Sequence, residues 1–119
     1  MASYFDGTHH PQQALSPRTG HVALVGEVVI GYIAGHLTTR HGCAAEVQYL
    51  FVAPEFRRRG VATALLRLMA DWFVTRGALK VCVCVDADSP EAEPFYASTG
   101  ASPFKRLWYR WEDISALQS

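Results

Sequence analysis

The sequence predicts an α+β (α/β) fold: a mixed, mostly antiparallel sheet with a central parallel pair of strands and helices packed on it. Runs of β-branched and aromatic residues separated by turn residues predict the strands. A long segment with helical periodicity between two apolar runs predicts a strand, helix, strand crossover, which makes its two strands parallel. With 119 residues, half of them apolar, we expect one domain over residues 1–119.

The first elements in chain order are an irregular segment and a β-hairpin. Residues 1–20 show little periodicity, so we expect an irregular N-terminal segment. Residues 21–25 and 28–38 are rich in β-branched residues and are separated by Gly26-Glu27. This pattern predicts two antiparallel strands.

The next elements form the crossover. Residues 46–52 predict a third strand, which Pro54 ends. From Val61 onward, apolar residues recur at helical spacing, and Gly77 predicts the C-terminal cap of this helix. A fourth strand is expected over residues 79–85.

A shorter helix and a last strand region complete the chain. Ser89 suits a helix cap, Pro90 suits the first turn, and the pattern runs to Thr99. Because Pro94 removes an N–H, the helix either begins later than Ser89 or has a kinked start. Residues 104–111 predict one or two strands, followed by a polar tail.

Composition excludes several classes of function. Eleven Lys and Arg balance eleven Asp and Glu, so we expect no nucleic-acid partner. No apolar stretch approaches the roughly 20 residues that cross a bilayer, and the first residues do not resemble a signal peptide. We therefore expect a cytoplasmic protein without a membrane partner.

The three cysteines do not predict a metal site. Cys43, Cys82 and Cys84 contain no Cys-x-x-Cys pair. Cys82 and Cys84 alternate with valines in an apolar strand, so buried and reduced thiols are expected. We therefore predict that the protein uses no metal.

A possible anion-binding loop follows the third strand. Residues 57–62, Arg-Arg-Arg-Gly-Val-Ala, open the long helix, where unpaired N–H groups and partial positive charge suit a phosphate. Gly60 allows dihedral angles and a close approach that other residues do not. The spacing is neither a Walker loop nor a dinucleotide fingerprint. The alternative is a solvated, arginine-rich helix start.

This loop resembles the Gln/Arg-x-x-Gly-x-Gly/Ala signature of the GNAT superfamily of N-acetyltransferases, with Arg57, Gly60 and Ala62 at the defining positions. The resemblance implies that the loop holds the pyrophosphate of acetyl-CoA and that the strand before it pairs with pantetheine. The implied cofactor-binding residues are Leu50, Phe51, Val52, Arg57, Arg58, Arg59, Gly60, Val61, Ala62 and Ser89.

The second helix carries another match to the same family. Its pattern Asn-x-x-Ala-x-x-Phe-Tyr-x-x-x-Gly-Phe aligns with Ser89, Ala92, Phe95, Tyr96, Gly100 and Ala101. In the family this tyrosine is the usual candidate to reprotonate the CoA thiolate, which implies Tyr96 as a catalytic residue. The alternative is core packing with a surface hydroxyl. Ser89 replaces the family's asparagine, so that cofactor contact is in doubt.

Glu46 is the second implied catalytic residue. Strand alternation is expected to place Glu46, Gln48, Leu50 and Val52 on one face. In some family members a glutamate eleven positions before the first arginine or glutamine of the loop is the general base, and that position here is Glu46. The alternatives are that Glu46 is a strand-edge charge in solvent, and that the base is a residue elsewhere or only an ordered water.

The resemblance implies acetyl transfer by direct attack of a primary amine within a ternary complex. A backbone N–H near Leu50 or Phe51 would meet the tetrahedral oxyanion. The expected acceptor is a small-molecule or peptide amine. A non-catalytic acyl-CoA-binding module, or an incomplete fragment of the family's domain, is the alternative.

Two further expectations concern partners. The carboxylates of Asp86, Asp88, Glu91 and Glu93 would favour a cationic acceptor, although for Glu91 and Glu93 the preferred explanation is capping of the second helix. The family's usual first strand and helix have no counterpart before residue 21, so a sheet edge would be open. We therefore predict a homodimer.

Overall fold

The computed structural model describes residues 14–118. Within that range the strands are β1 (Ala14–Val25), β2 (Val28–Thr38), β3 (Ala45–Val52), β4 (Val81–Cys84), β5 (Ser102–Lys105) and β6 (Trp108–Trp111). The helices are α2 (Val61–Thr75) and α3 (Ala92–Ser98), with short 3₁₀ helices η1 (Arg40–Gly42), η2 (Pro54–Phe56) and η3 (Ile114–Leu117).

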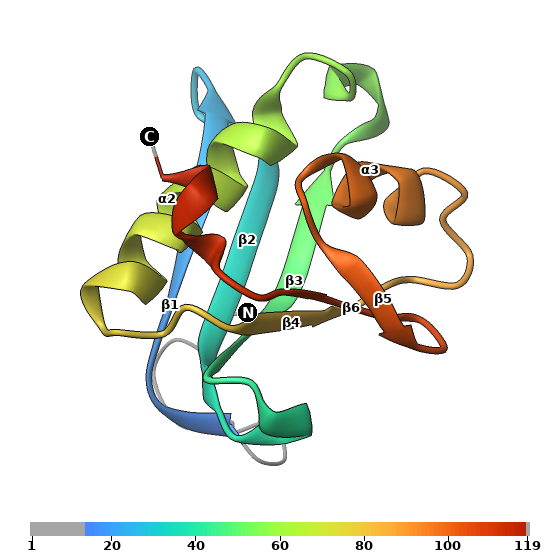
Figure 1. The fold of residues 1–119 in the computed structure, drawn as a ribbon. Coiled ribbons are helices and arrows are strands. Elements are labelled where there is room, and N and C mark those ends of the chain that lie inside the picture. The colour runs from blue at the N-terminus through green and yellow to red at the C-terminus, as the bar shows by residue number, and fades with distance from the viewer. Residues whose placement is uncertain (1–13, 119) are drawn as a thin grey trace.

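The strands form one mixed sheet in the order β1-β2-β3-β4-β6-β5 (Figure 1). Only the central pair, β3 and β4, is parallel, and the other neighbours are antiparallel. Helix α2 connects β3 to β4, as the crossover predicts, and both helices pack on the sheet. The predicted fold class is confirmed.

Strand β1 begins earlier than expected. Residues 14–20 belong to β1 and pair with β2 from Ala14, which lies opposite Thr38, so the prediction of an irregular segment is wrong for them. These residues have a composition typical of turns, but they form a strand because the long β2 provides hydrogen-bonding partners for them. Pro17 falls at a register shift in this edge strand, where proline is tolerated. Residues 1–13 lie outside the described part.

The core lies between the sheet and α2. Leu66, Met69 and Phe73 are fully buried against the sheet. A Cβ at Gly35 of β2 would come within 2.9 Å of the Phe73 ring, so the missing side chain lets the helix approach the strand closely. The predicted polar tail also contributes, because Ile114 of η3 is fully buried.

Several predicted boundaries are refined by the structure. Helix α3 starts at Ala92, so Pro94 is its third residue, where the N–H has no intrahelical acceptor in any case. Of the two possibilities that Pro94 left open, the later start is therefore correct. Strand β4 covers only 81–84 of the expected 79–85. Gly77 has φ 75° after α2, and Ala78 N donates to Phe73 O at 2.9 Å, which confirms the predicted cap.

Candidate active site

A β-bulge divides β3 into two halves. Ala34 lies opposite Tyr49 and Gly35 lies opposite Val47, so Gln48 is an extra residue without a partner on β2. The bulge shifts the alternation of side chains by one position. Val47 and Leu50 consequently both pack toward the core, and the prediction that Glu46 shares a face with Leu50 and Val52 is wrong.

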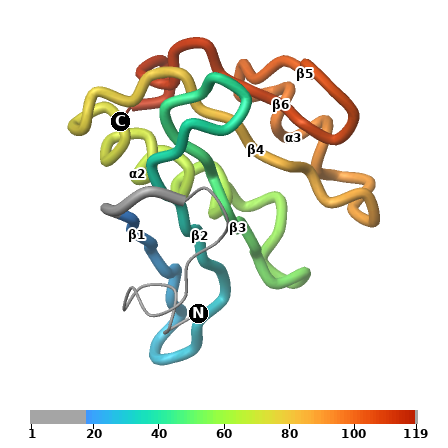
Figure 2. The backbone as a smooth tube through the Cα atoms, turned by 90° about the horizontal axis from the view of Figure 1, so that it is seen from below, coloured from blue at the N-terminus to red at the C-terminus, as the bar shows by residue number. Residues whose placement is uncertain are grey.

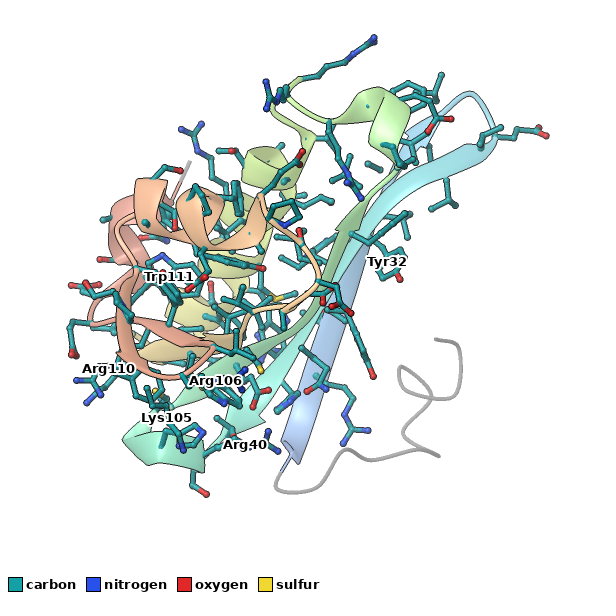
Figure 3. The ribbon with its side chains drawn as sticks, turned by 90° about the vertical axis from the view of Figure 1, so that its right-hand side faces the viewer. Tyr32, Arg40, Lys105, Arg106, Arg110 and Trp111 are labelled. Carbon is teal, nitrogen blue, oxygen red and sulfur yellow. The ribbon has the colours of Figure 1, made fainter. Side chains whose placement is uncertain are left out.

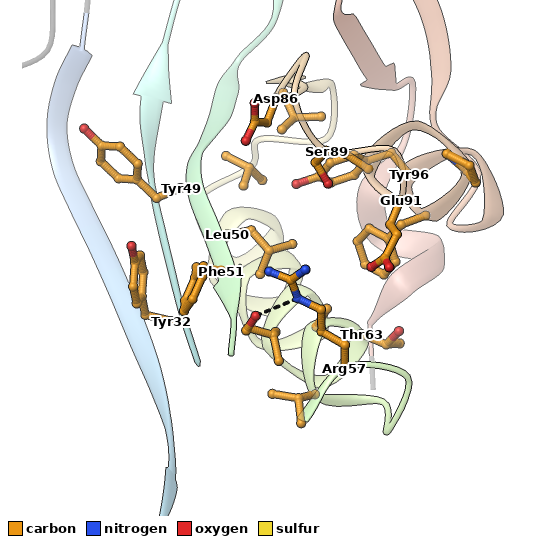
Figure 4. A pocket seen from close by; sticks show the side chains of 18 of the residues that line it. Tyr32, Tyr49, Leu50, Phe51, Arg57, Thr63, Asp86, Ser89, Glu91 and Tyr96 are labelled. Carbon is orange, nitrogen blue, oxygen red and sulfur yellow. Dashed lines mark hydrogen bonds between the residues drawn. The ribbon is translucent and has the colours of Figure 1, made fainter. Parts of the chain in front are cut away.

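Strands β3 and β4 separate beyond the bulge. They pair over only three residues, ending where Val47 lies opposite Val83, and β3 then continues to Val52 without β4 (Figure 2). The gap is part of a cleft of about 1140 Å³, lined by β3, the loop before α2, the end of β4 and α3 (Figure 4). The sheet thus opens between its two parallel strands.

The open half of β3 presents backbone groups to this cleft. Ala53 N donates to Ile30 O at 2.7 Å, which identifies the residues of β3 that hydrogen-bond to β2, since hydrogen-bonded and non-hydrogen-bonded pairs alternate along an antiparallel ladder. By alternation Phe51 exchanges hydrogen bonds with β2, while Leu50 and Val52 direct their N–H groups into the cleft. Of the two predicted oxyanion donors, the geometry therefore favours Leu50 over Phe51.

The predicted anion loop has the backbone geometry that the sequence implies. Gly60 lies in the left-handed region at φ 81° and immediately precedes α2. The first intrahelical bond runs from Ala64 N to Gly60 O at 3.0 Å, so the N–H groups of 61–63 have no intrahelical acceptor. A Cβ at Gly60 would meet no atom within 4 Å, so the requirement for glycine is conformational.

The three arginines of the loop have different surroundings. Arg57 donates from Nε to Val52 O at 2.9 Å, which ties the loop to the open half of β3 (Figure 4). Arg57 and Arg58 both line the cleft. The guanidinium of Arg59 instead lies over the Phe56 ring, 5.6 Å from its centroid, and Arg59 is not among the lining residues.

Tyr96 lines the cleft from α3. Its ring packs against Trp111 at a centroid distance of 5.8 Å, and only 7% of the residue is exposed. Burial raises the pKa of the Tyr96 hydroxyl, which keeps it protonated at neutral pH and able to donate a hydrogen bond. Ser89 lines the same wall, and its N–H donates to Asp86 O at 3.1 Å.

Glu46 lies in the closed half of β3 and is 3% exposed, so a strand-edge charge in solvent is wrong. Its Oε1 lies 3.6 Å from Arg40 Nε. Burial raises the pKa of the Glu46 carboxyl, and the positive charges of Arg40 and His36 oppose that rise. Glu46 is not among the residues that line the cleft.

Several residues that line the cleft were missed by the sequence reasoning, among them Thr63, Tyr32, Gln48 and Cys84. Thr63 follows the anion signature by one residue in the first turn of α2, so its spacing could have revealed it. Tyr32 and Gln48 reach the cleft through strand pairing and the bulge, which no local pattern shows. Cys84 is exposed at the cleft, so the prediction of burial is wrong for it, because β3 no longer covers the end of β4.

The acidic residues after β4 divide between the cleft and the surface. Asp86, Asp88 and Glu91 line the cleft. Glu91 is also the N-cap residue of α3, and Glu93 lies in its first turn, where its carboxylate accepts from the Tyr109 hydroxyl at 3.1 Å. The first three carboxylates can therefore meet a ligand, while Glu93 has a structural contact.

Residues 14–118 contain no group of three or more His, Cys, Asp or Glu side chains placed to hold a metal ion. None of the helices in this part of the chain has the length and apolar character needed to cross a membrane.

Comparison with known proteins identifies relatives of this fold. The model of the acetyltransferase (GNAT) family matches residues 2–101. Similar solved structures include an acetyltransferase of the GNAT family from Desulfovibrio desulfuricans (17% identity, TM-score 0.69, covering 82% of this chain and 69% of the other). Another is the PaiA N-acetyltransferase from Thermoplasma acidophilum in complex with coenzyme A (18% identity, TM-score 0.65, covering 78% of this chain and 58% of the other).

Ard1 from Thermoplasma volcanium is also similar, at 26% identity and a TM-score of 0.61, with 75% of this chain and 65% of the other covered. The chain therefore spans 58–69% of the length of these three relatives. The family match covers most of the 119 residues and both signature segments. The chain belongs to the acetyltransferase (GNAT) family.

Proposed function

We propose that the protein is an acetyl-CoA-dependent N-acetyltransferase that moves the acetyl group to a primary amine within a ternary complex. Membership of an acetyltransferase family supports acetyl transfer as the class of reaction. The observation that carries the proposal is the open half of β3, whose Leu50 and Val52 N–H groups face a cleft that begins at the anion loop.

The described residues fit acetyl-CoA as the donor. The N–H groups of Val61, Ala62 and Thr63, with the guanidinium groups of Arg57 and Arg58, suit a pyrophosphate. The backbone of 50–52 lacks a strand on the side of β4, and an amide of pantetheine supplies the missing hydrogen-bond partner. Acetyl-CoA brings the activated thioester to this position.

In the proposed reaction, the amine nitrogen forms a bond to the acetyl carbon, and the carbon–sulfur bond breaks. The Leu50 N–H stabilises the negative charge that develops on the carbonyl oxygen. The Tyr96 hydroxyl gives a proton to the departing thiolate, and the amine loses its own proton to a base. Because Glu46 is outside the lining, it acts as that base through an intervening water.

The test combines binding with turnover. Calorimetry should detect coenzyme A binding, and a panel of amines should release free CoA from acetyl-CoA. Tyr96→Phe and Glu46→Gln should keep CoA affinity and lose turnover. Failure to bind coenzyme A would contradict the whole proposal.

A non-catalytic acyl-CoA-binding module is the second candidate. It is favoured by the position of Glu46, which is buried beside Arg40 and outside the cleft. In that case the protein would bind acetyl-CoA but release no CoA with any amine tested. The incomplete-fragment alternative predicts the same result, and it would be separated by restoring turnover with a longer chain.

We also propose a homodimer. Strand β1 is an edge of the sheet, and the β1–β2 hairpin exposes five large apolar side chains, each more than half exposed: Val22, Leu24, Val25, Val28 and Val29. Apolar exposure on this scale is typical of an interaction surface. Sedimentation analysis of the wild-type chain and of a Val25→Thr, Val28→Thr variant tests it, and a monomer at all concentrations would contradict it.

The cytoplasmic location stays a prediction.

A further inference from the structure

A basic and aromatic surface lies beside the cleft on the face of the sheet opposite α2. His41 packs against Trp108 and Phe104, at ring centroid distances of 4.5 and 5.4 Å. Guanidinium groups cover two of the rings: Arg40 lies 5.8 Å from Trp108, and Arg110 lies 4.9 Å from Phe104. With the neighbouring turn, this basic aromatic surface comprises Arg40, His41, Phe104, Lys105, Arg106, Trp108 and Arg110. Figure 3 shows Arg40, Lys105, Arg106 and Arg110 in this region.

Strand pairing connects this surface to the cleft. Trp108 of β6 lies directly opposite Cys84 of β4, and residues paired in this way project on the same face. Cys84 lines the cleft, and Trp108 is its direct neighbour across the β4–β6 ladder. Tyr109 and Trp111, which alternate with these residues, are buried in the core on the other face. The anion loop therefore lines the cleft directly, whereas the basic aromatic surface lies next to it, beyond Cys84.

The positive charge of this surface is only partly neutralised. Arg40 is paired with Glu46, and Arg110 Nε lies 3.0 Å from Glu112. Lys105 and Arg106 are exposed, and neither takes part in an ion pair of the described residues. Partial burial, and then the charges of Lys105 and Arg40, lower the pKa of His41, which agrees with an excess of positive charge there.

The cleft itself has the opposite charge where it faces the loop after β4. Asp86, Asp88 and Glu91 line that wall. A cationic amine would be attracted to these carboxylates, while the basic aromatic surface would attract an anionic group on the same molecule. The two regions therefore complement a molecule with both charges better than a polyamine.

We propose that the acceptor is a primary amine that also carries a carboxylate or phosphate group, with its amine in the cleft and its anionic group on the basic aromatic surface. This inference rests on the proposed function, because it names the class of its second substrate.

The test measures binding rather than turnover, with and without coenzyme A. Calorimetry compares ω-amino carboxylates with ω-amino amides and diamines of the same chain length, and an ω-aminoalkyl phosphate distinguishes phosphate from carboxylate. The carboxylate or the phosphate should bind about threefold to tenfold tighter than the neutral amide, as expected for partly exposed ion pairs. The preference should fall as salt is added.

Matched variants locate the effect. Lys105→Gln with Arg106→Gln should abolish the preference. Arg67→Gln in α2 with Arg76→Gln directly after it makes the same change in net charge and should keep the preference. Tighter binding of the diamine, or equal loss of preference in both double variants, would overturn the inference. Because the probes are also tested without coenzyme A, such a result stands apart from a failure of coenzyme A to bind, which would contradict the proposed function instead.

Discussion

The two halves of β3 differ in what their backbone does. Before the bulge, Ala45, Glu46 and Val47 pair with a strand on each side and are buried. After it, residues 49–52 pair with β2 alone, and Leu50 and Val52 face the cleft. Within one strand, pairing on both sides gives stability, and pairing on one side leaves hydrogen-bonding groups for a ligand.

The largest effect is expected from a substitution at Gly60 in the anion loop, next to the open half of β3. Gly60→Val forces a β-branched side chain into φ 81°, where it is strained. We expect coenzyme A affinity to fall about 100-fold, since several N–H groups lose their alignment at once. Gly77→Val, with φ 75° at the other end of α2, is the control. Calorimetry should find that Gly77→Val binds coenzyme A with unchanged affinity. An equal loss of affinity in both variants would contradict the assignment of the loop around Gly60 as the pyrophosphate site.

Removing the hydroxyl of Tyr96 tests the chemistry of the open half without changing its packing. Tyr96→Phe should lower kcat about 100-fold, at the lower end of the range for acid catalysis, with little change in coenzyme A affinity. Because Tyr96 packs through its ring against Trp111, the melting temperature should hardly change. Steady-state kinetics with a responsive amine measures it, and an unchanged kcat would remove Tyr96 from the mechanism.

Two glycines of β2 compare the halves directly. A Cβ at Gly31 would lie 2.9 Å from Phe51 O in the open half, while one at Gly35 would lie 2.9 Å from both Glu46 O and the Phe73 ring. Gly35→Ala should lower the free energy of unfolding by about 1–3 kcal/mol through overpacking. Gly31→Ala should instead lower the affinity for coenzyme A while changing the free energy of unfolding less than Gly35→Ala does. Chemical denaturation and calorimetry separate the two, and the reverse pattern would show that the halves are not distinct.

Substitutions of Arg57 and Arg59 test which arginines of the loop contribute to coenzyme A binding in the open half. Arg57→Met loses a cleft charge and the bond from Nε to Val52 O, so coenzyme A affinity should fall about tenfold. Arg59→Met removes a charge from a side chain that lies over Phe56 but is not among the residues that line the cleft, so it should have a much smaller effect. Titrations at two salt concentrations check this, because the effect of Arg57→Met should shrink with added salt.

The smallest effect concerns the closed half and depends on pH. Burial raises the pKa of Glu46, so in the folded state the carboxylate is disfavoured, and its ionisation costs stability at neutral pH. Glu46→Gln should therefore raise the free energy of unfolding by about 1 kcal/mol at pH 7. The gain should vanish as the pH falls below the unfolded pKa of roughly 4.3.

Glu112→Gln is the matched control for Glu46→Gln, since Glu112 is 66% exposed. Thermal melts of both variants across this pH range test the sign. A gain that persists at low pH would show that the charge of Glu46 is not its cause.

The hairpin, the crossover and the anion loop could be predicted from the amino-acid sequence, because each depends on residues that are close together in the chain. The signature from Arg57 to Ala62 could be read as a helix start with a glycine in the left-handed region, and the structure agrees. Periodicity likewise predicted α2, whose apolar face forms the core. These features follow from local backbone preference and side-chain pattern.

Which groups face the cleft depends on how the strands pair, and it could not be predicted from the sequence. The bulge at Gln48 results from the register between β2 and β3, and it reverses the faces of the residues that follow. The burial of Glu46 and the exposure of Cys84 depend on where β3 and β4 stop pairing. Register and divergence are properties of pairs of strands distant in sequence, so no local pattern could have specified them.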